Sequence, residues 1–452
     1  GPEDKRTSLL RQAIIDGAEY VDLEEDTAKV TRRYGKTKRI VSHHDFRQTP
    51  DDLEEIHERL CQLDPDIVKI VTMANSPLDN VRMLELVKNA KVPTIGFCMG
   101  EMGVVSRILC GKFGAPFTYA TFSSERVMAP GQLSFEETKK LYRFDEINEN
   151  TAVFGVVGDP IGHSWSPLLH NAAFRKLGLN AVYLPMRIPP EEFEDGLRAY
   201  EKLGARGYSV TIPHKEAALK FANVADEASR QIGAANTLFK DSENRWCAAN
   251  TDYDAALAAI QLGLESKEET SLNGQRVLLL GAGGVARAIG LGCAREGAAV
   301  TVTNRTKDRG AKLAEELRCH FVTWANRGAV QSDILVNCTP MGMSPNMNAS
   351  PYEEHWFRET MVVFDTIYNP ENTLFLKQAR ERGCHCVSGL EMFVRQAAAQ
   401  FKYFTNQEPP LDDMRTVLRR GISPVRIKTE SGHASLGEIR DQQQKPPKSP
   451  EA

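Results

Sequence analysis

The stretch GQRVLLLGAGGVARAIGLGCAREGAAVTVTNRT, residues 274–306, decides the fold of the second half of the chain. An apolar run leads into a glycine-rich turn, a helical pattern of small apolar residues follows, and a second, β-branched run ends the stretch. This order predicts strand, tight turn, helix and strand, which form one β-α-β unit of a parallel sheet. We therefore expect an α/β fold.

The glycines of this stretch fit a turn that holds a dinucleotide. Gly281 permits the tight turn, Gly283 lets the backbone approach a pyrophosphate, and Gly284 permits close packing of the helix on the strand. The free N–H groups at the start of the helix then face the phosphates. Because a strand precedes the glycines and a helix follows them, we predict a Rossmann cofactor domain over 254–389 rather than a purely structural turn.

The residues after the second strand indicate which dinucleotide is bound. An acidic side chain at this place would select NAD by binding the ribose 2′-hydroxyl. The chain has Asn304, Arg305 and Thr306 instead. A guanidinium and two neutral hydrogen-bonding side chains suit a 2′-phosphate, so the sequence favours NADP(H). The alternative is that Arg305 is a solvated surface arginine.

Patterns on either side of this unit divide the chain further. A polar stretch at 146–150 predicts a linker, and β/α patterns on both sides of the cofactor domain, at 151–253 and 390–425, predict a second α/β domain for the substrate. The last residues, 426–452, have no apolar pattern and are expected to be disordered. The remaining segment, 1–145, is predicted to be a β/α domain of its own.

The front domain alternates strand and helix patterns, as parallel β/α units do. A closed eight-stranded barrel typically needs about 250 residues, which this segment lacks. We therefore predict either an open sheet or a partial (β/α) barrel with about five of eight strands. The five strand-like runs are EYVDLE (19–24), RIVSH (39–43), IVKIVTM (67–73), VPTIGFC (92–98) and FTYATF (117–122).

Composition narrows the classes of partner. The formal net charge is -4 and no basic stripe is present, which argues against nucleic-acid binding. No apolar run reaches the roughly 20 residues of a membrane span, and the start GPEDKR has no apolar signal region, so we expect a cytoplasmic protein. The 9 cysteines are scattered and odd in number, which indicates reduced thiols. GCHC (383–386) is a poor zinc set, and no metal is expected.

Four polar clusters stand in apolar surroundings at predicted strand ends, where a polyhydroxylated ligand would find donors and acceptors. On these clusters, residues 151–425 resemble the shikimate dehydrogenases, which implies NADPH-dependent, reversible reduction of 3-dehydroshikimate to shikimate. The clusters are GHSWSP (162–167), GYSVTIPHK (207–215), GAANTL (233–238) and NTDYDA (250–255).

The resemblance assigns roles to matching residues. It implies that Lys215 and Asp252 form the catalytic pair: hydride addition to a ketone leaves an alkoxide, which a lysine ammonium can protonate while a carboxylate orients it. The alternative for Lys215 is a surface lysine at a helix start. Two positions depart from the family, Ser209 in place of an asparagine and Tyr253 in place of a glycine. The implied substrate ligands are Ser164 and Ser166 for the carboxylate, and Thr211, Asn236 and Gln396 for the ring hydroxyls.

The front domain resembles the type I 3-dehydroquinate dehydratases, which are β/α barrels that form a Schiff base. The matching segments are SHHDF (42–46), DIVKIVTM (66–73), GVVSR (103–107) and APGQ (129–132). The resemblance implies that His44 is the general acid/base, Lys69 the imine-forming lysine, Arg107 a ligand of the substrate carboxylate and Gln132 a loop residue that closes the site.

The family's barrel has strands ahead of EYVDLE, and three of its eight are expected to be missing here. We therefore expect little or no conversion of 3-dehydroquinate. The unpaired edge of the first remaining strand would be an association surface, so a homodimer is expected.

Two alternatives stay open at this stage. A non-catalytic sensor of pathway intermediates would use the same folds, but the presence of Lys215, Asp252 and the glycine turn argues against it. A quinate dehydrogenase that uses NAD is the second alternative, and Arg305 disfavours it.

Overall fold

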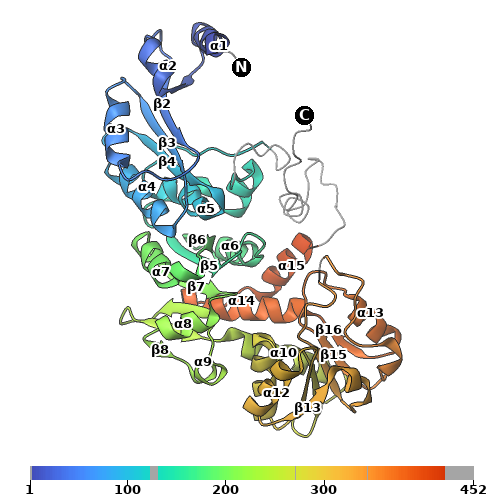
Figure 1. Cartoon of the computed structure of the whole chain (residues 1–452). Coiled ribbons are helices and arrows are strands. Elements are labelled where there is room, and N and C mark those ends of the chain that lie inside the picture. Colours follow the sequence, from blue (N-terminus) through green and yellow to red (C-terminus); the bar gives the residue numbers. More distant parts are fainter. Residues whose placement is uncertain (1–2, 123–130, 270, 344, 423–452) are drawn as a thin grey trace. The chain divides into compact units, whose positions relative to one another are not determined.

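The computed structural model describes residues 3–122, 131–269, 271–343 and 345–422 (Figure 1). Contacts divide the chain into two compact units. Unit 1 comprises Gly1–Pro167 and Gly178–His214, and unit 2 comprises Leu168–Leu177 and Lys215–Ala452. The two units are defined by contacts between residues, whereas the predicted domain boundaries are defined by sequence motifs. Those boundaries stay predictions. The predicted tail lies outside the described residues.

Unit 1 begins with a parallel four-stranded sheet in the order β1-β2-β3-β4. Helices alternate with the strands, as predicted. One face of the sheet packs against α3 and α4 through a core that includes Val41, Val68 and Ile70. The elements are α1 (Glu3–Ile15), β1 (Tyr20–Glu24), α2 (Glu25–Val30), β2 (Lys38–Asp45), α3 (Leu53–Cys61), β3 (Ile67–Met73), α4 (Pro77–Asn89), β4 (Thr94–Met99), α5 (Gly100–Leu109) and the short helices η1 (Cys110–Phe113), η3 (Glu137–Leu141) and η4 (Phe144–Glu146).

The predicted fifth strand at 117–122 is wrong. In the described residues this segment forms only an isolated bridge between Thr121 and Ser134. One carbonyl of this segment is bonded to a side chain of α5 instead, since Arg107 donates a hydrogen bond to the carbonyl of Tyr119 at 3.3 Å. The rings of Phe117 and Tyr119 pack against the apolar side chains of β2, β3 and β4. The described sheet is therefore open and has four strands.

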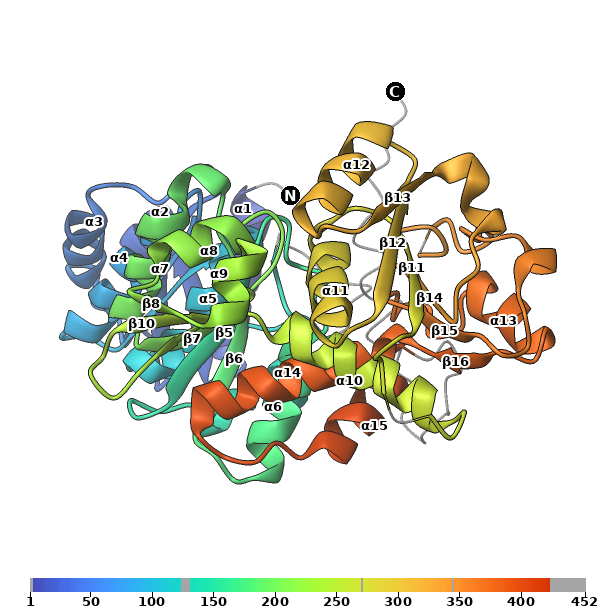
Figure 2. The ribbon, with the colours of Figure 1, turned by 90° about the horizontal axis from the view of Figure 1, so that it is seen from below.

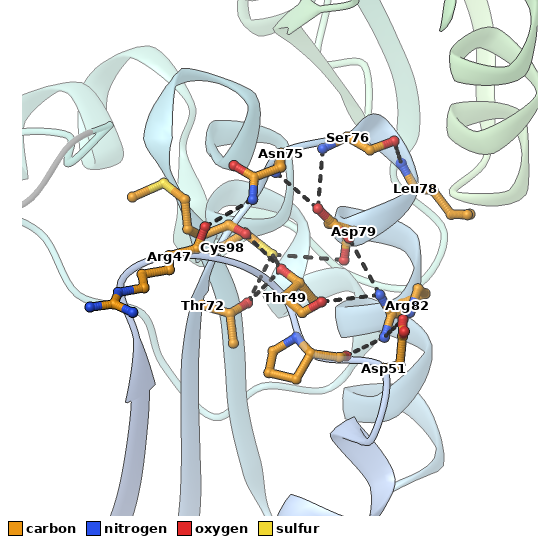
Figure 3. Close-up of polar contacts among 12 residues, drawn as sticks. Arg47, Thr49, Asp51, Thr72, Asn75, Ser76, Leu78, Asp79, Arg82 and Cys98 are labelled. Atoms are coloured by element: carbon orange, nitrogen blue, oxygen red, sulfur yellow. Dashed lines mark hydrogen bonds and ion pairs between the residues drawn. The ribbon is translucent and has the colours of Figure 1, made fainter.

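The start of α4 is fixed by a capping network (Figure 3). The Ser76 hydroxyl accepts a hydrogen bond from the N–H of Leu78, and the Asp79 carboxylate accepts from the N–H groups of Asn75 and Ser76, at 2.9 and 3.1 Å. Such a capping box satisfies N–H groups that the helix itself leaves without partners. It fixes the loop that leaves β3.

The second part of unit 1 is a parallel three-stranded group in the order β6-β5-β7. Its strands are nearly continuously apolar, as expected of a parallel sheet that is covered on both faces. The elements are β5 (Ala152–Gly158), β6 (Ala181–Arg187), η5 (Pro190–Glu192), α7 (Phe193–Lys202) and β7 (Ala205–Val210). Helix α6 (Ser166–Lys176) follows β5 in the sequence, and its residues from Leu168 on belong to unit 2.

Unit 2 contains a six-stranded parallel sheet in the order β13-β12-β11-β14-β15-β16 (Figure 2). This is the strand order of dinucleotide-binding folds, and the predicted strand, turn, helix and strand over 274–306 are confirmed. Helices α10 and α11 cover one face and α13 covers the other. The elements are β11 (Arg276–Leu280), α11 (Gly284–Arg295), β12 (Ala299–Asn304), α12 (Lys307–Glu316), β13 (His320–Thr323), η6 (Trp324–Ala329), β14 (Ile334–Asn337), η7 (Glu354–Trp356), β15 (Val362–Asp365), α13 (Leu374–Glu381) and β16 (His385–Val387).

A smaller group of elements completes unit 2. Strand β10 pairs antiparallel with β9 and parallel with β8. The long helix α14 packs against α10, so the segments before and after the six-stranded sheet meet. Among the helices of the described ranges, none is both long and apolar enough to cross a membrane. The elements are α8 (Lys215–Phe221), β8 (Val224–Ala225), α9 (Glu227–Ile232), β9 (Thr237–Lys240), β10 (Trp246–Ala249), α10 (Thr251–Glu265), α14 (Gly389–Thr405) and α15 (Leu411–Ile422).

Candidate active sites

The glycine turn between β11 and α11 leaves space in front of its backbone. Gly281 has φ +119°, and a Cβ there would lie 2.9 Å from the carbonyl oxygen of Cys338, so both conformation and space require glycine. At Gly283 and Gly284, an added Cβ would meet no atom within 4 Å. The N-cap of α11 is Gly283, and no side chain caps the helix. The first N–H groups of α11 are therefore available to an anion.

The Asn304–Thr306 segment lies beside this turn. Gly281 donates a backbone hydrogen bond to the carbonyl of Thr303 at 2.8 Å, which holds the end of β12 against the glycine turn. The Asn304 side chain donates to the carbonyl of Thr306 at 2.8 Å, and Arg305 is exposed. The structure thus brings together an open backbone turn and a solvated guanidinium.

Lys215 and Asp252 form a close ion pair in unit 2. The Nζ of Lys215 lies 2.5 Å from the Oδ2 of Asp252, and their side chains are 26% and 14% exposed. Lys215 opens α8 and Asp252 lies in the first turn of α10. The carbonyl of Lys215 accepts a hydrogen bond from the N–H of Ala235 at 2.9 Å, which ties the lysine to the segment before β9. A half-buried lysine next to a carboxylate can donate a proton to a bound oxygen as the ammonium and accept one from it as the neutral amine.

Asn236 supports the turn that carries Asp252. Its Oδ1 accepts a hydrogen bond from the N–H of Thr251 at 2.8 Å, and its Nδ2 donates to the Thr251 hydroxyl at 3.0 Å. Gln400 donates to the Asn236 carbonyl at 3.1 Å. Asn236 is buried, and so is Gln396, whose Nε2 donates to the carbonyl of Phe393 at 2.9 Å. The Asn236 side chain therefore lies next to the ion pair and holds the first residue of α10.

Tyr253, which stands in place of the family's glycine, follows Asp252 in the first turn of α10. Tyr253 is buried in a cluster with Ile232, Ala234 and Ala288. The guanidinium of Arg295 lies 5.9 Å from the centre of its ring. Tyr253 thus packs α10 into the protein.

The remaining predicted ligands of the dehydrogenase-like half lie in unit 1. Ser164 and Ser166 share one loop, in which the N–H of Ser166 donates to the Ser164 hydroxyl at 3.3 Å. Thr211 follows β7, and its methyl group lies 2.6 Å from where a Cβ on Gly158, the last residue of β5, would be. The three residues therefore gather at the carboxyl ends of β5 and β7. Ser209 is buried and its hydroxyl accepts a hydrogen bond from Tyr183 at 2.5 Å.

The four-stranded sheet of unit 1 carries a second ion pair, on the face opposite to the one that packs against α3 and α4. The Nζ of Lys69, on β3, lies 2.7 Å from the Oδ2 of Asp22, on β1. The Tyr119 ring covers the ammonium, with its centre 4.4 Å away, and the Tyr119 hydroxyl donates to Asp22 at 3.4 Å. Lys69 is 8% exposed. A buried lysine of this kind needs a charged partner, and the structure supplies one.

His44 lies on the same face. Its Nδ1 is 2.6 Å from the Oε1 of Glu24, the last residue of β1. Side chains alternate between the two faces of a strand, so His43 points to the opposite face, with Val41. Of the two neighbouring histidines, only His44 shares a face with Lys69.

Arg107 and Gln132 complete the predicted front site. Arg107 is buried, its guanidinium lies 4.2 Å from the centre of the Phe97 ring, and burial lowers its pKa to about 10. It therefore stays charged at neutral pH. Gln132 is half-buried after the 123–130 gap in the described residues.

Sequence reasoning missed Asp22 and Glu24. Both lie in YVDLE, two residues apart, and therefore on one face of β1. This alternation of acids at the end of an apolar strand was the signal that could have found them. They provide the carboxylates that pair with Lys69 and His44.

The cysteines and the possible metal ligands are other reactive side chains of the described residues. All 9 cysteines are free, and burial raises the pKa of Cys110 and Cys386 to about 11. Over the described ranges, no three His, Cys, Asp or Glu side chains are grouped as a metal site requires.

Family models match most of the chain. The type I 3-dehydroquinase model matches residues 1–149, and the shikimate dehydrogenase substrate binding domain matches residues 156–238. A coenzyme F420-dependent NADP oxidoreductase model matches residues 276–363, and the shikimate 5'-dehydrogenase C-terminal domain matches residues 389–419.

Individual relatives agree with these models. A bifunctional 3-dehydroquinate dehydratase/shikimate dehydrogenase of Arabidopsis thaliana, described as chloroplastic, is 38% identical over 91% of the chain and 71% of its own length. The shikimate dehydrogenase (NADP(+)) of Methanothermobacter thermautotrophicus is 39% identical over 61% of the chain and 99% of its own length. The solved shikimate 5-dehydrogenase of Thermus thermophilus, in complex with NADP(H) and shikimate, is 34% identical with a TM-score of 0.54, over 60% of the chain and 99% of that structure.

Proposed function

Because the chain belongs to the bifunctional 3-dehydroquinate dehydratase/shikimate dehydrogenase family, we propose that residues 151–425 catalyse the reversible, NADPH-dependent reduction of 3-dehydroshikimate to shikimate. The observation that carries this assignment is the Lys215–Asp252 ion pair, in the same unit as the glycine turn.

Lys215 is the proton donor in this proposal. As the carbonyl carbon of the substrate gains a hydride, its oxygen becomes an alkoxide and takes a proton from the Lys215 ammonium. Asp252 keeps the ammonium oriented and its charge balanced, at an Nζ–Oδ2 distance of 2.5 Å. In the reverse direction the neutral Lys215 amine accepts the proton of the substrate hydroxyl. A folded Lys215→Ala variant that has lost shikimate oxidation is the test of this role.

NADP is the cofactor in this proposal. When bound, it supplies or accepts the hydride. Gly281, Gly283 and Gly284 leave the opening for its pyrophosphate, and Asn304, Arg305 and Thr306 bind its ribose phosphate. The exposed guanidinium of Arg305 supports NADP over NAD.

The substrate is bound by its carboxylate and its ring hydroxyls. We assign the carboxylate to Ser164 and Ser166, and the hydroxyls to Thr211, Asn236 and Gln396. Hydroxyl and amide groups of this kind recognise a polyhydroxylated ring by donating and accepting together.

The two alternative functions, a quinate dehydrogenase and a non-catalytic sensor, predict different results in an activity assay. A quinate dehydrogenase would turn over quinate with NAD+, while a sensor would bind intermediates without turnover. The close Lys215–Asp252 pair favours catalysis over sensing, because a sensor has no need of a proton donor.

The second proposed activity belongs to the front sheet, which would dehydrate 3-dehydroquinate to 3-dehydroshikimate. The Lys69 amine condenses with the ketone and releases water, and the imine is the electron sink for removal of the neighbouring proton by His44. His44 then returns a proton to the departing hydroxyl, which leaves as water, and Glu24 orients its ring. Hydrolysis of the imine releases 3-dehydroshikimate and restores the Lys69 amine. Arg107 binds the carboxylate, and Gln132 is a loop residue that closes the site.

We expect this second activity to be low in this chain. Lys69 is held by Asp22 and covered by Tyr119, and the described sheet has four strands. Reduction with borohydride in the presence of 3-dehydroquinate would trap a Lys69 imine as a stable amine. A mass increase confined to the peptide with Lys69 supports the role, and an unchanged mass contradicts it.

Homodimer formation and a cytoplasmic location stay part of the proposal. Strand β1 is an edge of the front sheet, and sedimentation of the full chain tests whether two copies associate. The Arabidopsis thaliana relative is described as chloroplastic, so its location differs from the cytoplasmic location proposed for this chain.

A further inference from the structure

The loop that carries Ser164 and Ser166 is held by a residue from outside the dehydrogenase-like segment. Glu101 lies in the first turn of α5, within the residues that match the type I 3-dehydroquinase model. Its Oε1 accepts hydrogen bonds from the N–H groups of Gly162 and Ile161, at 2.7 and 3.4 Å. All these residues belong to unit 1, in which α5 packs beside β6 (Figure 1).

The second oxygen of Glu101 reaches the start of the same loop through an arginine. Arg187, at the end of β6, donates a hydrogen bond to the Oε2 of Glu101 at 3.2 Å and to the Oδ1 of Asp159 at 2.7 Å. The Glu101 and Arg187 side chains are 33% and 37% exposed. One carboxylate therefore fixes both the start and the middle of the 159–166 loop.

These bonds continue to the serines. The N–H of Ser164 donates to the carbonyl of Ile161 at 3.0 Å, and the N–H of Ser166 donates to the Ser164 hydroxyl at 3.3 Å. Ile161 is 4% exposed, so its side chain anchors the loop in the core. A shift of the Ile161–Gly162 backbone would therefore move the Ser164 hydroxyl.

We propose that Glu101 is a positioning residue for the substrate carboxylate, holding the Ser164–Ser166 loop in its binding geometry from the dehydroquinase-like part of the chain. This rests on the proposed function, which assigns the two serines to that carboxylate. The dehydroquinase-like part then contributes to shikimate binding even where its own reaction is slow. Glu101 touches neither substrate nor cofactor in this role.

Unit 1 offers a matched control. The Ser76 hydroxyl, at the N-cap of α4, donates to the Oε2 of Glu192 at 2.5 Å. Ser76 is fixed by the capping network of Figure 3. This contact joins the same two parts of unit 1 but does not touch the 159–166 loop. A variant that lacks the Glu192 carboxylate therefore shows the effect of a lost contact between these two parts of unit 1 when the 159–166 loop keeps its own contacts.

The experiment measures steady-state kinetics of the full chain with shikimate and NADP+. Glu101→Ala should raise KM for shikimate about tenfold, the effect of one charge-assisted hydrogen bond, with kcat and KM for NADP+ changed by less than about twofold. Glu101→Gln keeps an acceptor for the Gly162 N–H and should recover most of the affinity. Glu192→Ala should leave all three constants unchanged.

A second variant tests the contact if Glu101→Ala folds poorly. A Cβ on residue 162 would lie 2.8 Å from the Oε1 of Glu101, so Gly162→Ala displaces the carboxylate while Glu101 stays in place. It should also raise KM for shikimate. An unchanged KM in either variant, or an equal rise in Glu192→Ala, would overturn the proposal. If the unmodified chain does not oxidise shikimate, the proposed function fails and this proposal with it.

Discussion

The side-chain nitrogen of Lys69 lies 2.7 Å from the Oδ2 of Asp22, across β2 from strand β3 to strand β1. The side chains alone of Lys69 and Asp22 are 10% and 33% exposed. The lysine that we assign to imine formation is therefore not an isolated amine in an apolar strand. It has a counter-ion whose loss should affect both stability and reactivity.

Removal of this counter-ion should destabilise the front sheet. In Asp22→Asn the Lys69 ammonium stays buried without its charge partner, and we expect a loss of about 2 kcal/mol in the free energy of unfolding. Urea unfolding followed by a probe in residues 1–145 measures it.

The double variant Asp22→Asn with Lys69→Met is the control, because it removes both charges. Its destabilisation should be smaller than the sum of the two single variants. Strict additivity would show that the two side chains are not coupled.

Loss of the proton donor should abolish shikimate oxidation. Lys215→Met is expected to lower kcat by roughly 100- to 10,000-fold, the usual contribution of a general acid or base. Lys220→Met, on the same helix, is the matched control and should keep full activity, because Lys220 is exposed in the last turn of α8. Equal activity of the two variants would contradict the role of Lys215.

Arg305 should decide between the two dinucleotides. Charge-assisted hydrogen bonds contribute roughly 1.5–3 kcal/mol, so Arg305→Ala should raise KM for NADP+ about 10- to 100-fold and leave KM for NAD+ almost unchanged. Arg309→Ala, an exposed arginine of α12, is the control. A parallel change for both dinucleotides would mean that Arg305 does not read the 2′-phosphate.

Buried His170 should make unit 2 sensitive to acid. Burial lowers its pKa from 6.5 to about 3, while a hydrogen bond with Gln400 acts in the opposite direction. Below pH 6.5 the unfolded chain binds a proton that the folded chain excludes, so stability is complete above that pH and falls toward pH 3. Between pH 7 and pH 5 the expected loss is about 2 kcal/mol.

A His170→Phe variant measures this contribution. The ring lies near Phe174, Phe401 and Phe404, so an aromatic replacement suits the site. The pH dependence of its melting temperature should be shallower than that of the unmodified chain. The same slope in both proteins would contradict the assignment to His170.

The sequence was sufficient for the cofactor domain. In residues 274–306 an apolar strand pattern, glycines that the backbone conformation requires and a helical pattern follow one another directly. The local patterns therefore agree with the fold. The first four strands of the front sheet were also predictable, since each is a short apolar run between helical patterns.

Long-range contacts explain what was missed. The run at 117–122 has strand composition, but Arg107 bonds to its backbone at Tyr119 and no strand pairs along it in the described residues. Asp22 and Glu24 acquire their roles only when β1 lies next to β2 in register. Glu101 is separated by some 60 residues from the loop that it holds, and no local pattern marks such a contact.

The most direct test of the central claim is oxidation of shikimate by the full chain, followed through the absorbance of reduced nicotinamide. Shikimate and quinate are each assayed with NADP+ and with NAD+. The account predicts turnover with shikimate and NADP+ that exceeds the other three combinations. Turnover of quinate with NAD+ alone, or no turnover in any combination, would contradict it.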